Sequence, residues 1–212
     1  MKRLLAFGCS NTQGEGLPEF SVNPRTPSRF AWPQLLADCL DRTCVNQGYS
    51  GASNKLITDL ILDETYQTDD IVIVLWSSFA RTHLFLDNGK KMRLVPADCY
   101  RKESASKLRE WNKKLSKLYY MHFYTDKNHH RDNLIEINFA KQFLDSKGIE
   151  NYHFCWEKIE HELPHWNQIE IKLINLHREL GITEDKLHPS KLAHKQISRD
   201  ILCYITEKRS SR

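Results

Sequence analysis

Short runs of apolar residues alternate along the chain with stretches in which apolar residues recur every three or four positions. The runs have the length and β-branched character of buried strands, and the periodic stretches have the spacing of amphipathic helices. The predicted strands cover residues 3–7, 43–47, 70–76 and 151–156. The predicted helices cover residues 30–40, 53–66, 104–123, 132–147, 169–180 and 190–207. This alternation predicts an α/β fold, a three-layer α/β/α sandwich around a flavodoxin-like parallel sheet.

Local signals refine this picture. The stretch 70–76 is apolar on both faces, as a central parallel strand should be. Ser53 is placed to cap the helix that follows it, and Gly148 and Gly181 to end two others. Residues 79–101 are irregular and polar. We therefore expect one domain over residues 1–212, with a polar and helical insert around 79–131. Within it, residues 79–101 and 124–131 are expected to line the mouth of the functional site.

Composition excludes several classes of protein. The 212 residues suit one domain with a sizeable core. Lys and Arg number 31 and Asp and Glu 27, and this net charge of +4 is too small to indicate a nucleic-acid partner by itself. No apolar run approaches the roughly 18 residues that span a bilayer, so we expect no membrane partner.

The six cysteines are spread over the whole chain and form no CxxC pair. The apolar stretch Leu4 to Phe7, which follows a basic start, is shorter than the core of a secretion signal. We therefore expect reduced thiols and a cytoplasmic protein.

Small and polar residues follow three of the predicted strands and precede the last helix. These segments are residues 8–14, 46–54, 76–81 and 185–190. In doubly wound sheets the functional crevice lies at the carboxyl ends of the strands, so this is where we expect the chemistry.

In their order, these segments resemble the motifs of the SGNH (GDSL-like) hydrolases. That family has Gly-Asp-Ser after its first strand, a glycine in the loop after the second, and Asp-x-x-His before the last helix. The corresponding residues here are Gly8-Cys9-Ser10, Asn46 to Gly51, and Asp185 to His188 with Pro189 after it. The segment Trp32 to Ala37 is also similar to the first helix of the family.

The chemistry of these residue types agrees with the resemblance. A serine hydroxyl needs a base to become a nucleophile, and His188 could be the base for Ser10, oriented by Asp185. The backbone N–H groups of Ser10 and Gly51 are the candidate donors of an oxyanion hole.

Two positions depart from the family pattern. Cys9 stands where the family has the aspartate of Gly-Asp-Ser. The third family block, whose asparagine donates to the oxyanion, is replaced here by the segment 76–79. Ser78 aligns best with that asparagine, Asn54 is another nearby donor, and Arg81 and Trp76 are candidate substrate-binding residues.

The resemblance implies a serine hydrolase that cleaves a small acyl ester, such as an O-acetyl group on a carbohydrate, through an acyl-enzyme and without a cofactor. Several alternatives stay open. Ser10 could merely cap a turn, Asp185 and His188 could form a plain turn before a helix capped by Ser190, and Cys9 could be the nucleophile. The protein could also be a non-catalytic binding protein on the same fold, or an acyltransferase with the same triad.

One further motif concerns metals. Residues 161–165 read His-Glu-Leu-Pro-His and match the string HExxH of zinc proteases. Pro164 would break the helix that must bring both histidines to one face, so we expect no metal there.

Overall fold

A parallel sheet of five strands forms the centre of the computed structural model, which describes residues 2–19, 26–100, 107–157 and 171–211. Its strand order is β2-β1-β3-β6-β7, the flavodoxin-like order. The strands are β1 (Arg3–Gly8), β2 (Thr43–Gly48), β3 (Ile71–Trp76), β6 (Glu150–Cys155) and β7 (Ile171–Leu173). The predicted fold class is therefore confirmed.

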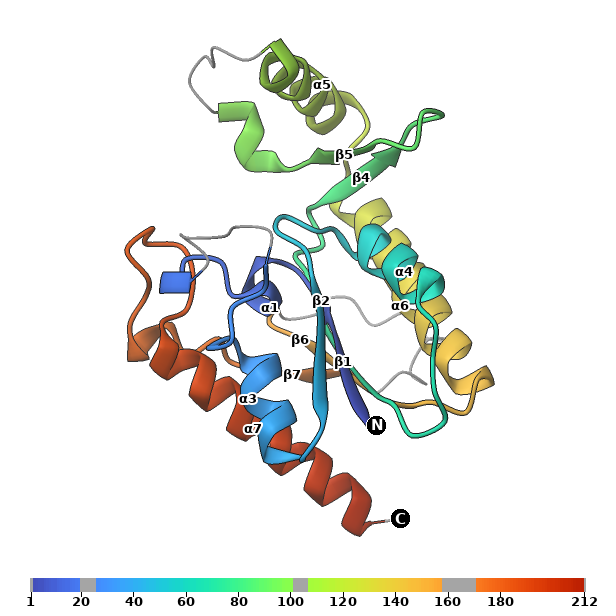
Figure 1. Ribbon diagram of the computed structural model, residues 1–212. Coiled ribbons are helices and arrows are strands. Elements are labelled where there is room, and N and C mark those ends of the chain that lie inside the picture. The colour runs from blue at the N-terminus through green and yellow to red at the C-terminus, as the bar shows by residue number, and fades with distance from the viewer. Residues whose placement is uncertain (1, 20–25, 101–106, 158–170, 212) are drawn as a thin grey trace.

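Helices cover both faces of this sheet, as Figure 1 shows. The helices on the two faces are α3 (Trp32–Cys39), α4 (Asn54–Asp63), α6 (Asp126–Ser146) and α7 (Lys191–Ser210), whereas the short α1 (Ser10–Gln13) follows β1 and α5 (Lys107–His122) stands apart from the sheet. Alternate residues of β1 and β3 point to opposite faces and enter two separate cores. One core contains α3 and α7, and the other contains α4 and α6. All six residues of β3 are buried, which explains their continuous apolar character.

The insert stands above the carboxyl ends of the strands in Figure 1. It contains a β-hairpin of β4 (Thr82–Phe85) and β5 (Lys91–Leu94), then the short 3₁₀ helix η1 (Pro96–Tyr100) and α5. Residues 79–101, expected to be irregular, thus contain regular structure. The turn of the hairpin carries Asn88-Gly89, a sequence signal for such turns.

The predicted helix over 169–180 is wrong. Within that range the structure has strand β7, a loop, and the short 3₁₀ helix η2 (Arg178–Leu180). Ile171, Lys172 and Leu173 alternate with the period of a strand, and their backbone pairs with the open edge of β6. The positive φ of His177, 51°, then interrupts any helical continuation.

Helix α6 begins at Asp126, six residues before the predicted start at Asp132. The side chain of Thr125 caps it by accepting a hydrogen bond from the N–H of Asn128. Ser53 caps α4 in the same way, as predicted, through the N–H of Leu56. All six cysteines lie in the described ranges, and none of them forms a disulfide bond.

Candidate active site

The segments that follow the strands converge on one cleft of about 510 Å³ between the sheet and the insert. Of the predicted site residues, the cleft lining includes Ser10, Gly51, Ser78, Arg81 and His188. The insert contributes further walls through Arg93 and residues 95–97. The segment 124–131, also expected at the mouth, is absent from the described lining.

Asp185 and His188 form a close pair in the loop before α7. Nδ1 of His188 lies 2.6 Å from Oδ2 of Asp185. Because an ionised carboxylate only accepts, this contact places the proton on Nδ1 and leaves Nε2 of His188 able to act as a base.

The other oxygen of Asp185 organises the loop itself. Oδ1 accepts hydrogen bonds from the Thr183 hydroxyl and from the N–H groups of Leu187 and His188. Burial alone would raise the pKa of Asp185, but these hydrogen bonds hold that pKa well below its usual range. Asp185 is therefore ionised near pH 7, as an orienting carboxylate must be. Ser190 also caps α7, as the alternative of a plain turn before a capped helix predicted. The cap and the pairing of Asp185 with His188 therefore occur in the same loop.

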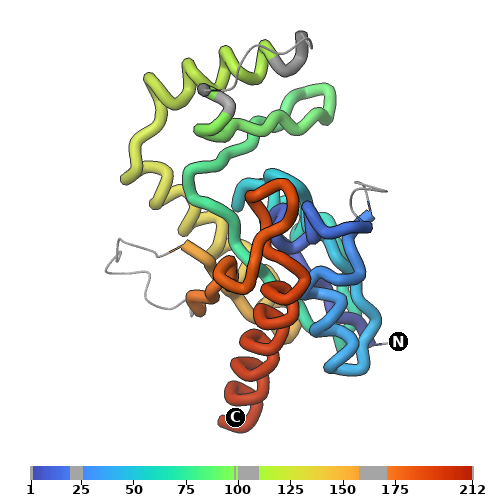
Figure 2. Tube along the Cα trace, turned by 90° about the vertical axis from the view of Figure 1, so that its left-hand side faces the viewer, coloured from blue at the N-terminus to red at the C-terminus, as the bar shows by residue number. Residues whose placement is uncertain are grey.

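This loop packs against the segment that follows Ser10, and Figure 2 shows the two in red and blue. A Cβ atom on Gly16, which has φ +84°, would lie 2.8 Å from Oδ2 of Asp185. Only a residue without a side chain fits this approach. Residues that are far apart in the sequence are thereby brought to one edge of the sheet.

Ser10 is the first residue of α1 and is 5% exposed. The cap position of α1 is occupied by Cys9, and Ser10 makes no capping hydrogen bond. Among the described residues, no hydrogen bond joins the Ser10 hydroxyl to His188. Instead, Nε2 of His188 lies 3.7 Å from Oε2 of Glu15, which also accepts a hydrogen bond from Ser50.

Ser10 and Gly51, whose backbone N–H groups are the predicted oxyanion donors, both line the cleft. Gly51 has φ +75° and lines the cleft beside Ser10. In the described part of the chain, no hydrogen bond uses the N–H of Ser10 or of Gly51. Ser78 also lines the cleft, and its hydroxyl oxygen accepts a 3.4 Å contact from the N–H of Ala80.

Asn54 is not an available oxyanion donor, which corrects the prediction. Its side chain is fully buried and donates to the carbonyl of Ser77 and to Oδ1 of Asn133, at 3.2 and 2.6 Å. Its own Oδ1 accepts from the N–H of Ser77 at 2.7 Å. With both amide hydrogens used, Asn54 fixes the end of β3 to α4 and α6.

Trp76 is likewise wrong as a substrate-binding residue. It is fully buried in the core that contains α4 and α6, and its indole N–H donates to Nδ1 of His153 at 3.1 Å. Its position as the last residue of β3 points it into this core. Cys9 is also fully buried in the same core, which contradicts its alternative role as nucleophile.

The cleft also contains residues that the sequence analysis did not assign. Glu15, Arg93, Trp156, Arg178 and Lys186 line it together with the predicted residues. They come from loops, the hairpin and η2, whose placement depends on tertiary structure rather than on a local pattern. The closely spaced basic residues Lys90, Lys91 and Arg93 were the available sequence signal for Arg93.

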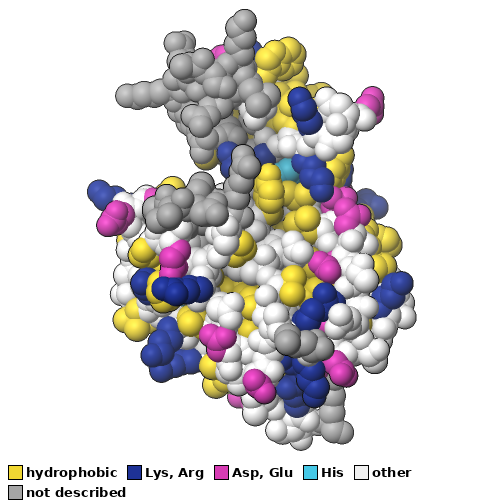
Figure 3. All heavy atoms as spheres, viewed as in Figure 1, with side chains coloured by type: hydrophobic (Ala, Val, Ile, Leu, Met, Phe, Trp, Pro, Cys, Tyr) yellow, Lys and Arg dark blue, Asp and Glu magenta, His cyan; other side chains and the backbone are white. Residues whose placement is uncertain are grey.

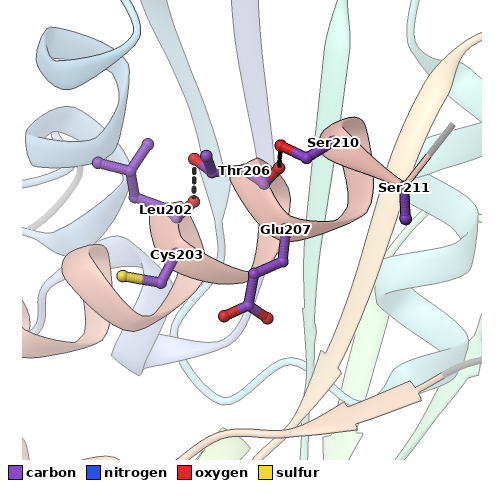
Figure 4. Close-up of a pocket in the computed structure, with 6 residues that line it drawn as sticks. All are labelled: Leu202, Cys203, Thr206, Glu207, Ser210 and Ser211. Carbon is purple, nitrogen blue, oxygen red and sulfur yellow. Dashed lines mark hydrogen bonds between the residues drawn. The ribbon is translucent and has the colours of Figure 1, made fainter.

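Two other hollows have different characters. A cavity of about 330 Å³ beside the cleft is lined by residues of α4, α6 and the insert, and Arg81 reaches both spaces. Its histidines hold the insert: His83 contacts the Ser53 hydroxyl at 2.8 Å, and His129 contacts the Tyr119 hydroxyl at 2.7 Å. The second hollow lies on one face of α7 near its end (Figure 4), and its described lining comes from that helix and its cap.

No group of three or more His, Cys, Asp and Glu side chains that could hold a metal ion occurs in the described ranges. His161 and His165 lie outside them. Within those ranges, too, every helix is too short or too polar to cross a bilayer.

Comparison with known proteins supports the fold described above. No family model and no curated protein matches the sequence. Among solved structures, an esterase from Pseudoalteromonas sp. is 12% identical with a TM-score of 0.52, covering 98% of both chains. A G-D-S-L family lipolytic protein from Veillonella parvula is 10% identical with a TM-score of 0.51, covering 97% of this chain and 99% of that one. The chain has the SGNH hydrolase fold.

Two carbohydrate-active proteins share this SGNH fold. An acetyl xylan esterase from Butyrivibrio proteoclasticus is 11% identical with a TM-score of 0.57, and 99% of this chain covers 64% of that one. A carbohydrate esterase, described as having divergent catalytic and non-catalytic binding functions, is 12% identical with a TM-score of 0.54, with 97% and 65% covered. The chain thus spans less than two thirds of the length of these two esterases.

Proposed function

We propose that the protein is an esterase that cleaves a small acyl ester through Ser10, His188 and Asp185. The observation that carries this proposal is the cleft itself. It joins the Ser10 side chain, two unused backbone N–H groups, and a histidine paired with an ionised aspartate.

In the proposed reaction, Nε2 of His188 takes the proton of the Ser10 hydroxyl as its oxygen attacks the ester carbonyl. The tetrahedral oxyanion accepts hydrogen bonds from the N–H groups of Ser10 and Gly51. His188 then gives its proton to the leaving alcohol, and an acyl-Ser10 intermediate forms. Water, deprotonated by His188, attacks this intermediate. The bond between the acyl group and the Ser10 oxygen then breaks, His188 returns the proton to that oxygen, and the acid leaves.

The contact between His188 and Glu15 is compatible with this sequence of steps. Hydrogen bonds of catalytic groups are often loose in free enzymes and tighten when substrate binds. When His188 carries two protons, the carboxylates of Asp185 and Glu15 both lie close to the imidazolium and stabilise it. As a small acyl ester, an acetylated sugar is a candidate substrate, since two fold relatives are carbohydrate esterases.

A fluorophosphonate probe tests the proposal directly. We expect the wild-type protein and Ser146→Ala, which alters an exposed serine on α6, to be labelled and to hydrolyse 4-nitrophenyl acetate. Ser10→Ala should do neither, and peptide mass spectrometry should place the label on Ser10. Lack of labelling and of hydrolysis in folded wild-type protein would contradict the esterase and favour a non-catalytic binding protein.

A further inference from the structure

We propose that the ester bound in this cleft carries an anionic group, a carboxylate or a phosphate, which Arg93 and Arg81 bind beside Gly51. This inference rests on the proposed esterase function, because it names the class of ester. The anion-binding step itself does not depend on hydrolysis.

The first observation is the charge of the lining. Four basic side chains, Arg81, Arg93, Arg178 and Lys186, line the cleft against one carboxylate, that of Glu15. In the space-filling view, Lys and Arg side chains gather where the molecule narrows between the insert and the body (Figure 3). A concave site lined mainly by one sign of charge concentrates ligands of the opposite sign.

Two described carboxylates at the cleft, those of Glu15 and Asp185, are already engaged by other groups. Glu15 accepts from the Ser50 hydroxyl and faces His188, and Asp185 pairs with His188. Within the described residues, no carboxylate forms an ion pair with Arg81, Arg178 or Lys186. Arg81 is partly buried, and its described side-chain hydrogen bond goes to the neutral hydroxyl of Ser77, at 3.0 Å.

Removing a cation from water without a counter-charge costs free energy, and a bound anion recovers it. A ligand anion is therefore the partner that the half-buried Arg81 lacks among the described side chains. Trp156 adds a neutral donor, because its indole N–H is buried at the cleft with no hydrogen-bond partner in the described part of the chain.

The second observation is the position of Arg93. This side chain comes from β5 and packs directly on Gly51, where a Cβ atom would lie 2.4 Å from Nη1 of Arg93. The guanidinium is thus held next to the proposed oxyanion donor. Its fork of N–H groups fits a carboxylate or phosphate through two parallel hydrogen bonds. An anionic group within a few atoms of the ester carbonyl would reach it.

Steady-state kinetics on paired esters give the first test. We expect the wild-type protein to hydrolyse 4-nitrophenyl hemisuccinate with a higher kcat/KM than 4-nitrophenyl acetate. Arg93→Gln should lower kcat/KM for the hemisuccinate roughly 10- to 100-fold more than for the acetate, the usual effect of losing a charged hydrogen bond. Lys90→Gln removes an exposed charge from the same hairpin, away from the cleft lining, and should leave the ratio unchanged.

Calorimetric titration of Ser10→Ala separates this inference from the esterase proposal. Succinamate and glycerol 3-phosphate test the carboxylate and the phosphate as ligands, and succinamide and glycerol are their neutral controls. The inference is supported if at least one anion binds and its neutral control does not, and if this binding is lost in Arg93→Gln and kept in Lys90→Gln. This result would hold even if wild-type protein cleaves no ester. Equal binding of charged and neutral ligands, or no binding of any, would overturn the inference, as would a preference for the neutral ester in the kinetic test.

Discussion

Asn54 shows how one residue type can serve either chemistry or structure. Asn54 follows the second strand and was predicted to be an oxyanion donor. Here, however, the side chain of Asn54 makes three short contacts with Ser77 and Asn133 and has no exposed surface. Its role is to hold the loop that carries Ser78 and Arg81 in place.

Asn54→Ala should therefore act on stability. It leaves the N–H and carbonyl of Ser77 and the Oδ1 of Asn133 without this partner, and should lower the free energy of unfolding by roughly 2–4 kcal/mol. Urea unfolding measures this, with Asn128→Ala on the exposed surface of α6 as a neutral control. A variant of wild-type stability that has lost activity 100-fold would instead identify Asn54 as an oxyanion donor.

At the scale of elements, the hairpin of β4 and β5 matters most because it carries Arg93 and follows Arg81. One side chain ties it to α5. The Tyr120 hydroxyl lies within hydrogen-bond distance of the carbonyls of Ala80 and Leu94, at the two ends of the hairpin. This tie fixes both arginine-bearing segments relative to α5.

Tyr120→Phe should loosen the hairpin without unfolding the sheet. The loss of a hydrogen bond of about 1 kcal/mol should raise amide exchange in residues 82–94 roughly fivefold. Hydrogen exchange with mass spectrometry would detect this change. Tyr124→Phe is the matched control, since the Tyr124 hydroxyl contacts Asp126 instead. Equal protection of the hairpin in both variants would show that Tyr120 does not hold it.

The helices and strands also show which elements a local sequence pattern can predict and which it cannot. Four of the five strands and the capped α4 have local patterns that predicted them, because both faces of the sheet are covered by helices. The short edge strand β7 is stabilised by pairing with β6, so its local pattern was ambiguous. The hairpin carried a usable signal in Asn88-Gly89, but the flanking residues are too polar to indicate strands by hydrophobicity.

The site residues likewise divide into those that a local sequence pattern indicates and those that it does not. Ser10, Gly51, Asp185 and His188 belong to short ordered motifs, and the sequence indicates them. Arg93 reaches Gly51 only because a separate hairpin folds over the end of the sheet. Such a contact has no local sequence pattern.

At the scale of the whole molecule, three buried histidines couple stability to pH. Burial lowers the pKa of His83 to about 4 and the pKa values of His153 and His194 to about 3. Each is neutral in the folded protein but takes up a proton in the unfolded chain below about pH 6.5. For His153, a proton on Nδ1 would also break the hydrogen bond from Trp76.

Stability contributed by these histidines is therefore complete above about pH 6.5 and is lost as the pH falls toward 4. Each should remove about 2 kcal/mol from the free energy of unfolding between pH 7 and pH 5. Urea titrations at several pH values measure how steeply the free energy of unfolding falls with pH. His153→Gln or His83→Gln should make this slope shallower, whereas His122→Gln, an exposed histidine of α5, should not. Parallel slopes in all variants would contradict this assignment.

The place of the insert in the chain has a consequence for how such a protein can change its specificity. The proposed hydrolytic residues, at 10, 51, 185 and 188, lie before and after the insert in the sequence, whereas Arg81 and Arg93 lie in one continuous stretch after β3. That stretch leaves the sheet after Trp76 and rejoins it through α6. A genetic exchange of this single segment would replace the ligand-selecting wall and leave the bond-breaking groups untouched. The proposed catalytic residues and the two proposed anion-binding arginines are thus encoded in separate parts of the gene, so that each set can change in evolution without the other.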